Sequence, residues 1–257
     1  MIFGVLLKKN KKILLLGGSG NLGKAIIKSK FFKSLYYPSK KKLNLLDKSK
    51  IKKTLIKYKI DLVINCAAMA RVLDCEKNPK KAFKINVDGT ENLILQMKES
   101  EKYLKKKIKL VHLSSDAVYP GKKGNYKETD QLLPYNTYGW SKLFSEISVK
   151  TLKKYIIIRT KFFDKNKIRF NKSAIDTFSS RIEINELVKK IKFLLDRDFN
   201  GVINIGSERL SDYKAYKKYK ISLKPCKRIE IIKNLQVVLP KDCSMNIRLL
   251  KKLKSRL

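Results

Sequence analysis

Residues 13–23, ILLLGGSGNLG, decide the fold of this chain. The first four form a continuous apolar run, which is typical of a short strand buried on both faces of a parallel sheet. Glycines then recur at every third position, and a helical pattern begins at Leu22. Glycine lets the chain turn tightly and lets its backbone approach a pyrophosphate, which the N-terminus of a helix stabilises. This order predicts a dinucleotide-binding site. The residues expected around the phosphates are Gly17, Gly20, Asn21, Leu22 and Gly23.

Short apolar runs and helical patterns continue to alternate through the first 160 residues. The apolar runs at residues 34–37, 61–65, 109–113 and 155–159 are predicted strands. Helical patterns cover residues 22–30 and 141–150, and Asn78 followed by Pro79 is typical of another helix start. This alternation predicts an α/β fold, a Rossmann-type doubly wound parallel sheet.

The pattern weakens after Thr160. Residues 185–195 and 201–205 still indicate a helix and a strand that could return to the sheet, whereas the segments around them are rich in Lys and weakly periodic. We therefore expect a Rossmann domain over residues 11–160, joined by residues 184–206. A small, abbreviated C-terminal substrate lobe would comprise residues 161–183 and 207–257.

The chain is strongly basic, with 61 Lys and Arg residues against 22 Asp and Glu and a formal net charge of +39. Only nine of these cations are Arg, and the lysines are spread from end to end. Arg is the usual reader of base edges and phosphates. The charge therefore indicates solvated lysine-rich faces and argues against a nucleic-acid partner, although it should attract anionic nucleotides at low salt.

The cysteines, the single histidine and the apolar start of the chain indicate the cellular compartment and the metal and membrane partners to expect. The four cysteines form no CxxC pair and there is one histidine, so we expect free thiols in a reducing cytoplasm and no metal site. Residues 1–7 are apolar, but they lack the charge and length of a signal peptide or a spanning helix. We expect a short strand, a frayed tail or an early start codon there, and no membrane partner.

Tyr138 and Lys142 form a Tyr-x-x-x-Lys pattern that would place both side chains on one face of a helix. A nearby ammonium should lower the pKa of the phenol, so that it can exchange a proton with a carbonyl oxygen near neutral pH. Ser115 precedes them at the end of a predicted strand, where open α/β sheets bind ligands. We predict that these three residues are catalytic and that Tyr138 and Lys142 also contact the cofactor. His112, inside the strand, is expected to pack in the core.

The segment after the second predicted strand bears on the choice of cofactor. An acidic residue there would bind the ribose 2′-hydroxyl of NAD. Residues 37–42 are YPSKKK, with the hydroxyl of Ser39 and three lysines but no carboxylate. This favours NADP, bound in part by Ser39, with NAD as the alternative.

Together these motifs resemble the extended short-chain dehydrogenases/reductases, and within them the dTDP-4-dehydrorhamnose reductase-like sugar-nucleotide reductases. The resemblance covers residues 12–160 well and the remainder in patches. It is carried by the glycine loop and by LNLLD at 43–47, NCAA at 65–68, VHLSSDAVY at 111–119, YKETD at 126–130 and YGWSK at 138–142.

The resemblance implies NADPH-dependent reduction of the 4-keto group of a nucleotide-linked deoxysugar, for surface-polysaccharide synthesis, by a protein that pairs as a homodimer. It assigns Ser115, Tyr138 and Lys142 to a catalytic triad. The remaining assignments are Asn44 and Leu45 near the adenine, Ala67 and Ala68 along the cofactor, and Met69, Asp116 and Val118 at the substrate.

Three departures from the family pattern bear on the reaction. Asn44 stands where the family usually has Asp. Ala117 stands where sugar-nucleotide dehydratases carry a Glu base, which disfavours dehydration, and the Cys and His pair used for 3,5-epimerisation is missing. The alternatives left open are an NAD-dependent 4-epimerase and a non-catalytic nucleotide-sugar-binding subunit, the latter favoured by the short segment 162–180.

Overall fold

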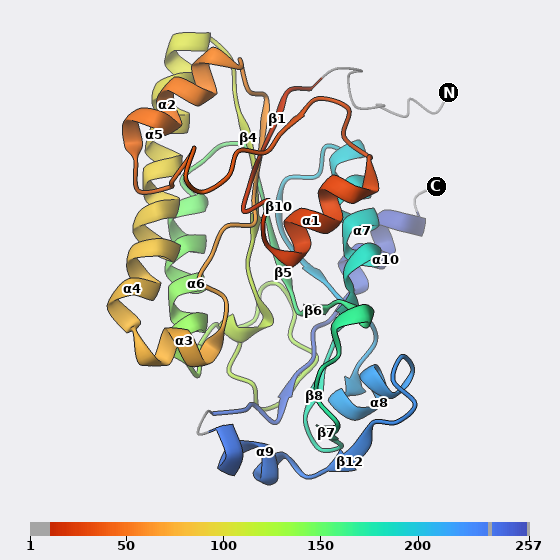
Figure 1. Cartoon of the computed structure of the whole chain (residues 1–257). Helices are drawn as coiled ribbons and strands as arrows, with labels where there is room; N and C mark the ends of the chain where they lie inside the picture. Colours follow the sequence, from red (N-terminus) through yellow and green to blue (C-terminus); the bar gives the residue numbers. More distant parts are fainter. Residues whose placement is uncertain (1–10, 236–237, 256–257) are drawn as a thin grey trace.

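Six parallel strands form the central sheet of the protein, in the order β10-β5-β4-β3-β1-β2 (Figure 1). The computed structural model describes residues 11–235 and 238–255, so the apolar start at residues 1–7 lies outside the described residues. The strands are β1 (Ile13–Leu16), β2 (Leu35–Tyr36), β3 (Leu62–Asn65), β4 (Lys109–Leu113), β5 (Tyr155–Thr160) and β10 (Gly201–Ile205). The sheet confirms the predicted doubly wound α/β fold, and β10 pairs with β5 at its edge.

Helices cover both faces of this sheet (Figure 1). The helices on one face are α1 (Asn21–Ser29), α7 (Ile184–Asp196) and α10 (Arg248–Ser255), and those on the other are α2 (Lys48–Lys57), α5 (Gly89–Leu104) and α6 (Thr137–Val149). Alternate residues of β1 serve the two layers: Ile13 and Leu15 face the first, and Leu14 and Leu16 the second. Because both faces are covered, the strand is apolar throughout, as the sequence indicated.

The order of the strands reverses between β1 and β3. After β1 the chain moves to β2 at one edge, and it then returns to β3 on the other side of β1. Ligands of open α/β sheets bind at such a switch point, beyond the carboxyl ends of the strands. The loops after β1 and β3 touch here: a Cβ atom on Gly17, whose φ is +79°, would lie 2.6 Å from the Ala67 nitrogen.

Helix α6 begins four residues before the start that the sequence pattern indicated. Asn136 caps it, since its Oδ1 accepts a hydrogen bond of 2.7 Å from the Gly139 N–H. Tyr138 and Lys142 therefore lie in one helix. On the same face of the sheet lie α3 (Val72–Lys77) and α4 (Pro79–Phe83), and α4 begins at Pro79 as predicted, although the Asn78 side chain makes no capping bond.

Several short elements lie beyond the carboxyl ends of the sheet (lower part of Figure 1). They form three small sheets, ordered β11-β8-β13, β12-β7 and β6-β9. Their strands are β6 (Phe162–Phe163), β7 (Lys172–Ala174), β8 (Phe178–Ser179), β9 (Ile182–Glu183), β11 (Leu210–Ser211), β12 (Lys224–Cys226) and β13 (Asp242–Cys243), with helices α8 (Asp212–Lys217) and α9 (Arg228–Leu235).

Two observations concern the setting of the protein. Over residues 11–235 and 238–255, no helix combines the length and apolar character needed to cross a membrane. All four cysteines are free, and the same ranges contain no group of three or more His, Cys, Asp and Glu placed to hold a metal ion.

Candidate active site

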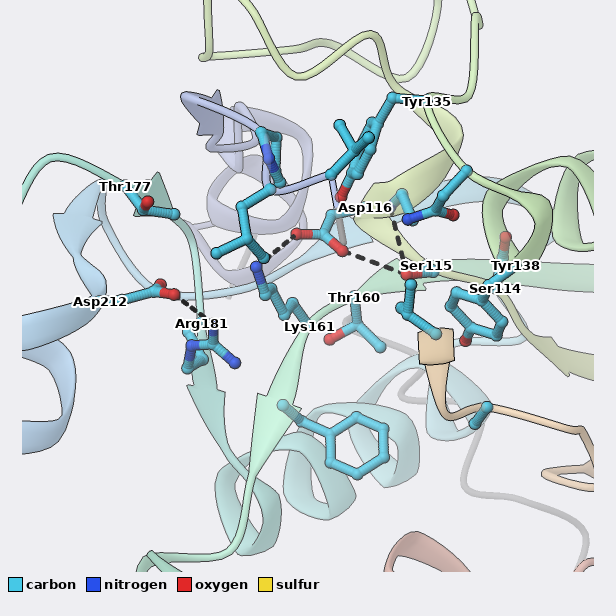
Figure 2. Close-up of a pocket in the computed structure, with 18 residues that line it drawn as sticks. Ser114, Ser115, Asp116, Tyr135, Tyr138, Thr160, Lys161, Thr177, Arg181 and Asp212 are labelled. Carbon is cyan, nitrogen blue, oxygen red and sulfur yellow. Dashed lines mark hydrogen bonds and ion pairs between the residues drawn. The ribbon is translucent and has the colours of Figure 1, made fainter. Parts of the chain in front are cut away.

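A cavity of about 360 Å³ opens at the carboxyl ends of β4 and β5 (Figure 2). Ser115 and Asp116 enter it directly after β4, and Tyr138 enters it from α6. Two of the three predicted catalytic residues therefore meet in one cavity with the predicted substrate residue Asp116. Their common position follows from the sheet, because neighbouring parallel strands end at the same edge.

Ser115 is held by its own turn. Its backbone is extended, and it precedes the short 3-10 helix Asp116–Val118. Its Oγ accepts a hydrogen bond of 3.2 Å from the Ala117 N–H and donates one of 3.1 Å to Asp116 Oδ1. A ligand oxygen bound here would compete with Asp116 for the Ser115 proton.

Tyr138 and Lys142 occupy successive turns of α6, but they meet different environments. Tyr138 is half-buried, and burial raises the pKa of its phenol, an effect that the Ser115 hydroxyl partly offsets. Lys142 is buried, and burial lowers the pKa of its ammonium to about 8. The prediction that the phenol has a lowered pKa is therefore wrong for the described structure, because Lys142 Nζ is directed at His112 Nε2, 3.2 Å away.

His112 has a more specific environment than the core packing expected for it. It is buried in β4, and its Nε2 lies 3.1 Å from Ser145 Oγ as well as near Lys142. Burial, reinforced by the charge of Lys142, lowers the pKa of the imidazole well below its usual value. A neutral ring can accept a hydrogen bond from the ammonium, so His112 orients Lys142.

A buried ion pair that sequence reasoning missed fixes α6 on the sheet. Arg159 of β5 donates from Nη2 to Glu146 Oε2 at 2.8 Å, and Ser114 Oγ donates to Glu146 Oε1 at 2.5 Å. Arg159 Nη1 also donates to the Tyr119 hydroxyl at 3.0 Å and to the Glu128 carbonyl at 2.9 Å. The signal available was Arg itself, which is scarce in this chain and suits buried, multiply bonded ion pairs.

Asn86 is a second residue that sequence reasoning missed. Between α4 and α5 the helix makes a π turn, Lys84–Asp88, whose extra residue turns Asn86 inward and leaves its apolar neighbour Ile85 half-buried. Asn86 Oδ1 accepts from the Met69 N–H at 2.7 Å, and its Nδ2 donates to the Met69 carbonyl at 3.0 Å and to Ser141 Oγ at 2.8 Å. It thereby clamps the loop after β3 against α6.

The glycine loop has the form that a pyrophosphate requires. A Cβ atom on Gly23 would lie 2.3 Å from the Gly17 carbonyl oxygen, so glycine is needed for the loop to close onto α1. No side chain caps α1 and its first turn has no acidic residue, which leaves the N–H groups near Asn21 and Leu22 available to an anion. Gly20 is the N-cap. These residues fit the dinucleotide predicted for them.

The other predicted cofactor residues border this loop in different ways. Ala67 and Ala68 follow β3 directly, and Ala67 touches the glycine turn. Ser39 is exposed in the turn after β2, and Asn44 Oδ1 accepts from the Leu46 N–H at 3.1 Å. The Leu45 side chain is buried in the core, so a contact with adenine would fall to its backbone.

Two of the predicted substrate residues are placed away from the cavity lining. Val118 is fully buried in a cluster with Tyr119, Tyr126 and Met245, because the 3-10 turn directs it inward. Its prediction as a substrate contact is therefore not supported, and Ala117 lines the cavity instead. Met69 is held through its backbone by Asn86, and its neighbour Ala70 reaches the lining.

The far wall of the cavity carries charged side chains that sequence reasoning also missed. Lys161, Arg181 and Asp212 come from beyond β5, and Arg181 Nη2 donates to Asp212 Oδ2 at 2.8 Å (Figure 2). In a chain so rich in Lys and with weak periodicity after residue 160, no local pattern marks them. They make this wall polar and charged.

A parallel sheet with a glycine loop at its switch point and Ser, Tyr and Lys at its carboxyl edge defines an extended short-chain dehydrogenase/reductase. The model of the RmlD substrate binding domain family matches residues 11–189. The chain belongs to this family, which confirms the family expected from the sequence motifs.

Individual relatives agree with this assignment. The chain is 29% identical over 150 residues to methionine adenosyltransferase 2 subunit beta of Bos taurus, covering 54% of this chain and 43% of that protein. It is 30% identical over 154 residues to dTDP-4-dehydrorhamnose reductase of Aggregatibacter actinomycetemcomitans, covering 58% and 50%. The match thus spans about half the length of each curated relative.

The likeness in three dimensions runs almost the whole length. The crystal structure of dTDP-4-dehydrorhamnose reductase from Bacillus anthracis in complex with NADP superposes with a TM-score of 0.83 at 24% identity. The superposition covers 95% of this chain and 92% of that one. The fold therefore extends through the small sheets as well as the central one.

Proposed function

We propose that this protein is an NADPH-dependent reductase of the 4-keto group of a nucleotide-linked deoxysugar, acting in the cytoplasm to supply surface-polysaccharide synthesis. The observation that carries the proposal is that Ser115 and Tyr138 line one cavity, with Lys142 buried on the next turn of α6. Membership of the family and the reductase among its relatives support the same chemistry.

The roles of the three residues follow from their positions. NADPH, when bound, supplies the hydride that reduces the sugar C4. Ser115 donates a hydrogen bond to the carbonyl oxygen, and Tyr138 delivers its phenolic proton to that oxygen, so the ketone becomes a hydroxyl. The ammonium of Lys142, one turn further along α6 and held by His112, is placed to bind the ribose of the cofactor.

The preference for NADPH rests on the turn after β2. Gly18 of the phosphate loop faces Tyr37, since a Cβ atom on the glycine would lie 3.5 Å from the tyrosine Cβ. Ser39 and the exposed lysines at 40–42 follow at once. A ribose 2′-phosphate would meet a hydroxyl and several cations there. We expect NADPH to bind more tightly than NADH, by a margin that shrinks as salt is added.

The function is tested by following NADPH absorbance with dTDP-4-keto-6-deoxy-L-mannose as substrate. We expect the wild type to consume NADPH and the Tyr138→Phe variant, which retains the ring but loses the proton, to consume almost none. A wild type that binds NADPH but leaves this substrate untouched would contradict the proposal.

A second candidate is a non-catalytic nucleotide-binding subunit. The observation in its favour is the similarity to a protein named as a subunit of methionine adenosyltransferase 2. This candidate predicts that NADPH binds without being consumed with any nucleotide sugar, and that Tyr138→Phe changes nothing measurable.

We also propose that the protein pairs as a homodimer through α5 and α6. Trp140, Phe144 and Ile147 recur along one face of α6 and are exposed, as is Leu95 on α5. Exposed apolar side chains gathered on one face favour an interface. Light scattering should give twice the chain mass for the wild type and the single chain mass for Phe144→Glu.

A further inference from the structure

The wall of the cavity opposite Tyr138 contains several buried polar atoms that have no hydrogen-bond partner within the described part of the chain. Among the described residues, Asp116 Oδ2, Thr160 Oγ1, Thr177 Oγ1 and Arg181 Nε are buried without a hydrogen-bond partner. All four residues line the cavity, and the side chains of Asp116, Thr160 and Thr177 are almost fully buried (Figure 2). A buried polar atom without a partner is costly, so such a group of them indicates a bound ligand.

Two cations lie within this wall. Lys161 Nζ lies 3.7 Å from Asp116 Oδ2, which is within reach of charge attraction but beyond hydrogen-bond distance. Arg181 Nη2 donates a hydrogen bond to Asp212. The Arg181 guanidinium also stacks over the Tyr216 ring, with 4.8 Å between Cζ and the ring centroid. The wall therefore offers several N–H donors that the described protein atoms leave unused.

The two cations of the wall face two carboxylates, of which Asp116 is the weaker acid. Burial raises the pKa of Asp116, so its carboxyl group takes up a proton more readily than an exposed one. Burial also acts to raise the pKa of Asp212, but Arg181 and Lys161 lower it overall, so Asp212 stays ionised. The pKa of Lys161 is raised despite its burial, because the carboxylates around it outweigh the desolvation. Both cations thus remain charged. Of the two carboxylates that face them, Asp116 is the one more readily neutralised by a proton.

The position of the wall fixes which part of a substrate would meet it. Asp116 bridges the two regions: its Oδ1 accepts from Ser115 Oγ at 3.1 Å, and its Oδ2 faces Lys161. Lys161 is therefore one carboxyl group away from the serine that holds the reacting oxygen. A substituent beside the reacting carbon can span that gap, whereas the diphosphate is attached at C1, across the ring from C4.

We propose that Lys161 and Arg181 bind a carboxylate on the sugar ring, so that the protein binds an acidic sugar nucleotide more tightly than a neutral one, while a neutral 4-keto-6-deoxysugar is still reduced. The inference rests on the proposed function, because that function places the sugar in this cavity. A carboxylate accepts hydrogen bonds from Arg181 Nε, Lys161 Nζ and the hydroxyls of Thr160 and Thr177. A neutral hydroxyl would make weaker, uncharged hydrogen bonds with the same donors.

Titration calorimetry in the presence of NADP⁺ tests this with UDP-glucuronate and UDP-glucose, which differ only in a ring carboxylate. The dTDP forms of both sugars are run in parallel, so the result does not depend on the base. We expect the acidic sugar of at least one pair to bind about tenfold more tightly or better, as one charge-assisted contact would give. Lys161→Met should lower that ratio severalfold, because it weakens binding of the acidic sugar more than binding of the neutral one.

Matched variants distinguish carboxylate binding by the cavity wall from the attraction that the basic protein surface exerts on any anion. Lys161→Arg keeps a cation and should retain the preference, and Lys123→Met removes an exposed lysine paired with Asp130 and should not alter it. A wild-type ratio near one in both pairs, or no binding of any of the four, would overturn the proposal. Equal weakening of both sugars by Lys161→Met would also overturn it, and would assign the wall to the diphosphate.

Failure of the proposed function has a different signature. If the protein binds sugars but does not reduce them, the acidic preference persists while NADPH is not consumed. Tyr138→Phe should likewise keep the preference, because its phenol contributes to turnover and not to the charged wall.

Discussion

Two groups of charged side chains lie on either side of Ser115, one fully buried and one partly buried at the cavity, and their hydrogen bonding differs. Behind it, Arg159 and Glu146 are joined by hydrogen bonds of 2.8 to 3.3 Å, and Arg159 Nη1 has two further acceptors. On the cavity side of Ser115, the Lys161 ammonium makes no hydrogen bond among the described residues, and Arg181 Nε has no partner. The first group is complete within the protein, and the second is not.

The contrast distinguishes structural charges from binding charges. A buried pair in which every guanidinium nitrogen has a partner serves to hold the fold, and Arg159–Glu146 holds α6, with Tyr138 and Lys142, against β5. Unpaired donors that are shielded from water raise the free energy of the folded protein, and a ligand that accepts their hydrogen bonds lowers it again. Substitutions in the two groups should therefore affect different properties.

The largest effect on stability is expected for Arg159→Met. It leaves Glu146 buried without its cation, a change that typically costs about 3–5 kcal/mol in the free energy of unfolding. Urea denaturation measures this. Lys189→Met, which removes an exposed pair with Glu186, is the control and should leave the urea midpoint close to that of the wild type. Similar midpoints for the two variants would break the comparison.

Tyr138→Phe should lower kcat about a thousandfold, within the range of about 10²–10⁴ for a lost general acid. That corresponds to roughly 4 kcal/mol of transition-state stabilisation. The free energy of unfolding should stay within about 1 kcal/mol of wild type, because a half-buried hydroxyl is all that is removed. A large loss of stability would mean that Tyr138 belongs to the structural group.

Lys142 should make stability depend on pH in a particular window. Burial lowers the pKa of its ammonium to about 8, below the reference value of 10.5 for an exposed lysine. The unfolded chain then binds more protons than the folded one between these values. Stability therefore rises with pH across that window, by up to roughly 3 kcal/mol. The rise should vanish in Lys142→Met, and parallel curves for the two proteins would refute the assigned burial.

Lys161→Met should have the smallest effect on stability, within about 1 kcal/mol without ligand. The Lys161 ammonium makes no hydrogen bond among the described residues, and Asp116, left without its cation, can take up a proton because burial already raises its pKa. Thermal unfolding of the ligand-free protein checks this. A loss of stability as large as that of Arg159→Met would mean that both groups of charged side chains serve to stabilise the fold.

The same contrast explains what the sequence could and could not reveal. The glycine loop, Ser115, Tyr138 and Lys142 stand in local patterns whose order is informative, and the parallel sheet follows from continuous apolar runs. The early start of α6 depended on Asn136, whose capping bond has no periodic signal. Asn86 turned inward only because a π turn changed the phase of its helix.

The charged wall was hidden for a further reason. Lys161, Arg181 and Asp212 are separated by 20 to 51 positions, and they meet only because short strands and α8 bring them to one side of the cavity. Lys161 is also one of many lysines, so its type carried no information. The scarcity of Arg was the available signal, since Arg159 forms a buried ion pair and Arg181 a partly buried one.

The most direct test of the central claim uses NADPH deuterated at the transferred position, with dTDP-4-keto-6-deoxy-L-mannose as substrate. We expect mass spectrometry and NMR to locate one deuterium at C4 of the product sugar with the wild type, and almost none with Tyr138→Phe. A wild type that releases no labelled product, while NADPH binding is demonstrated, would contradict the reductase assignment and favour a binding subunit.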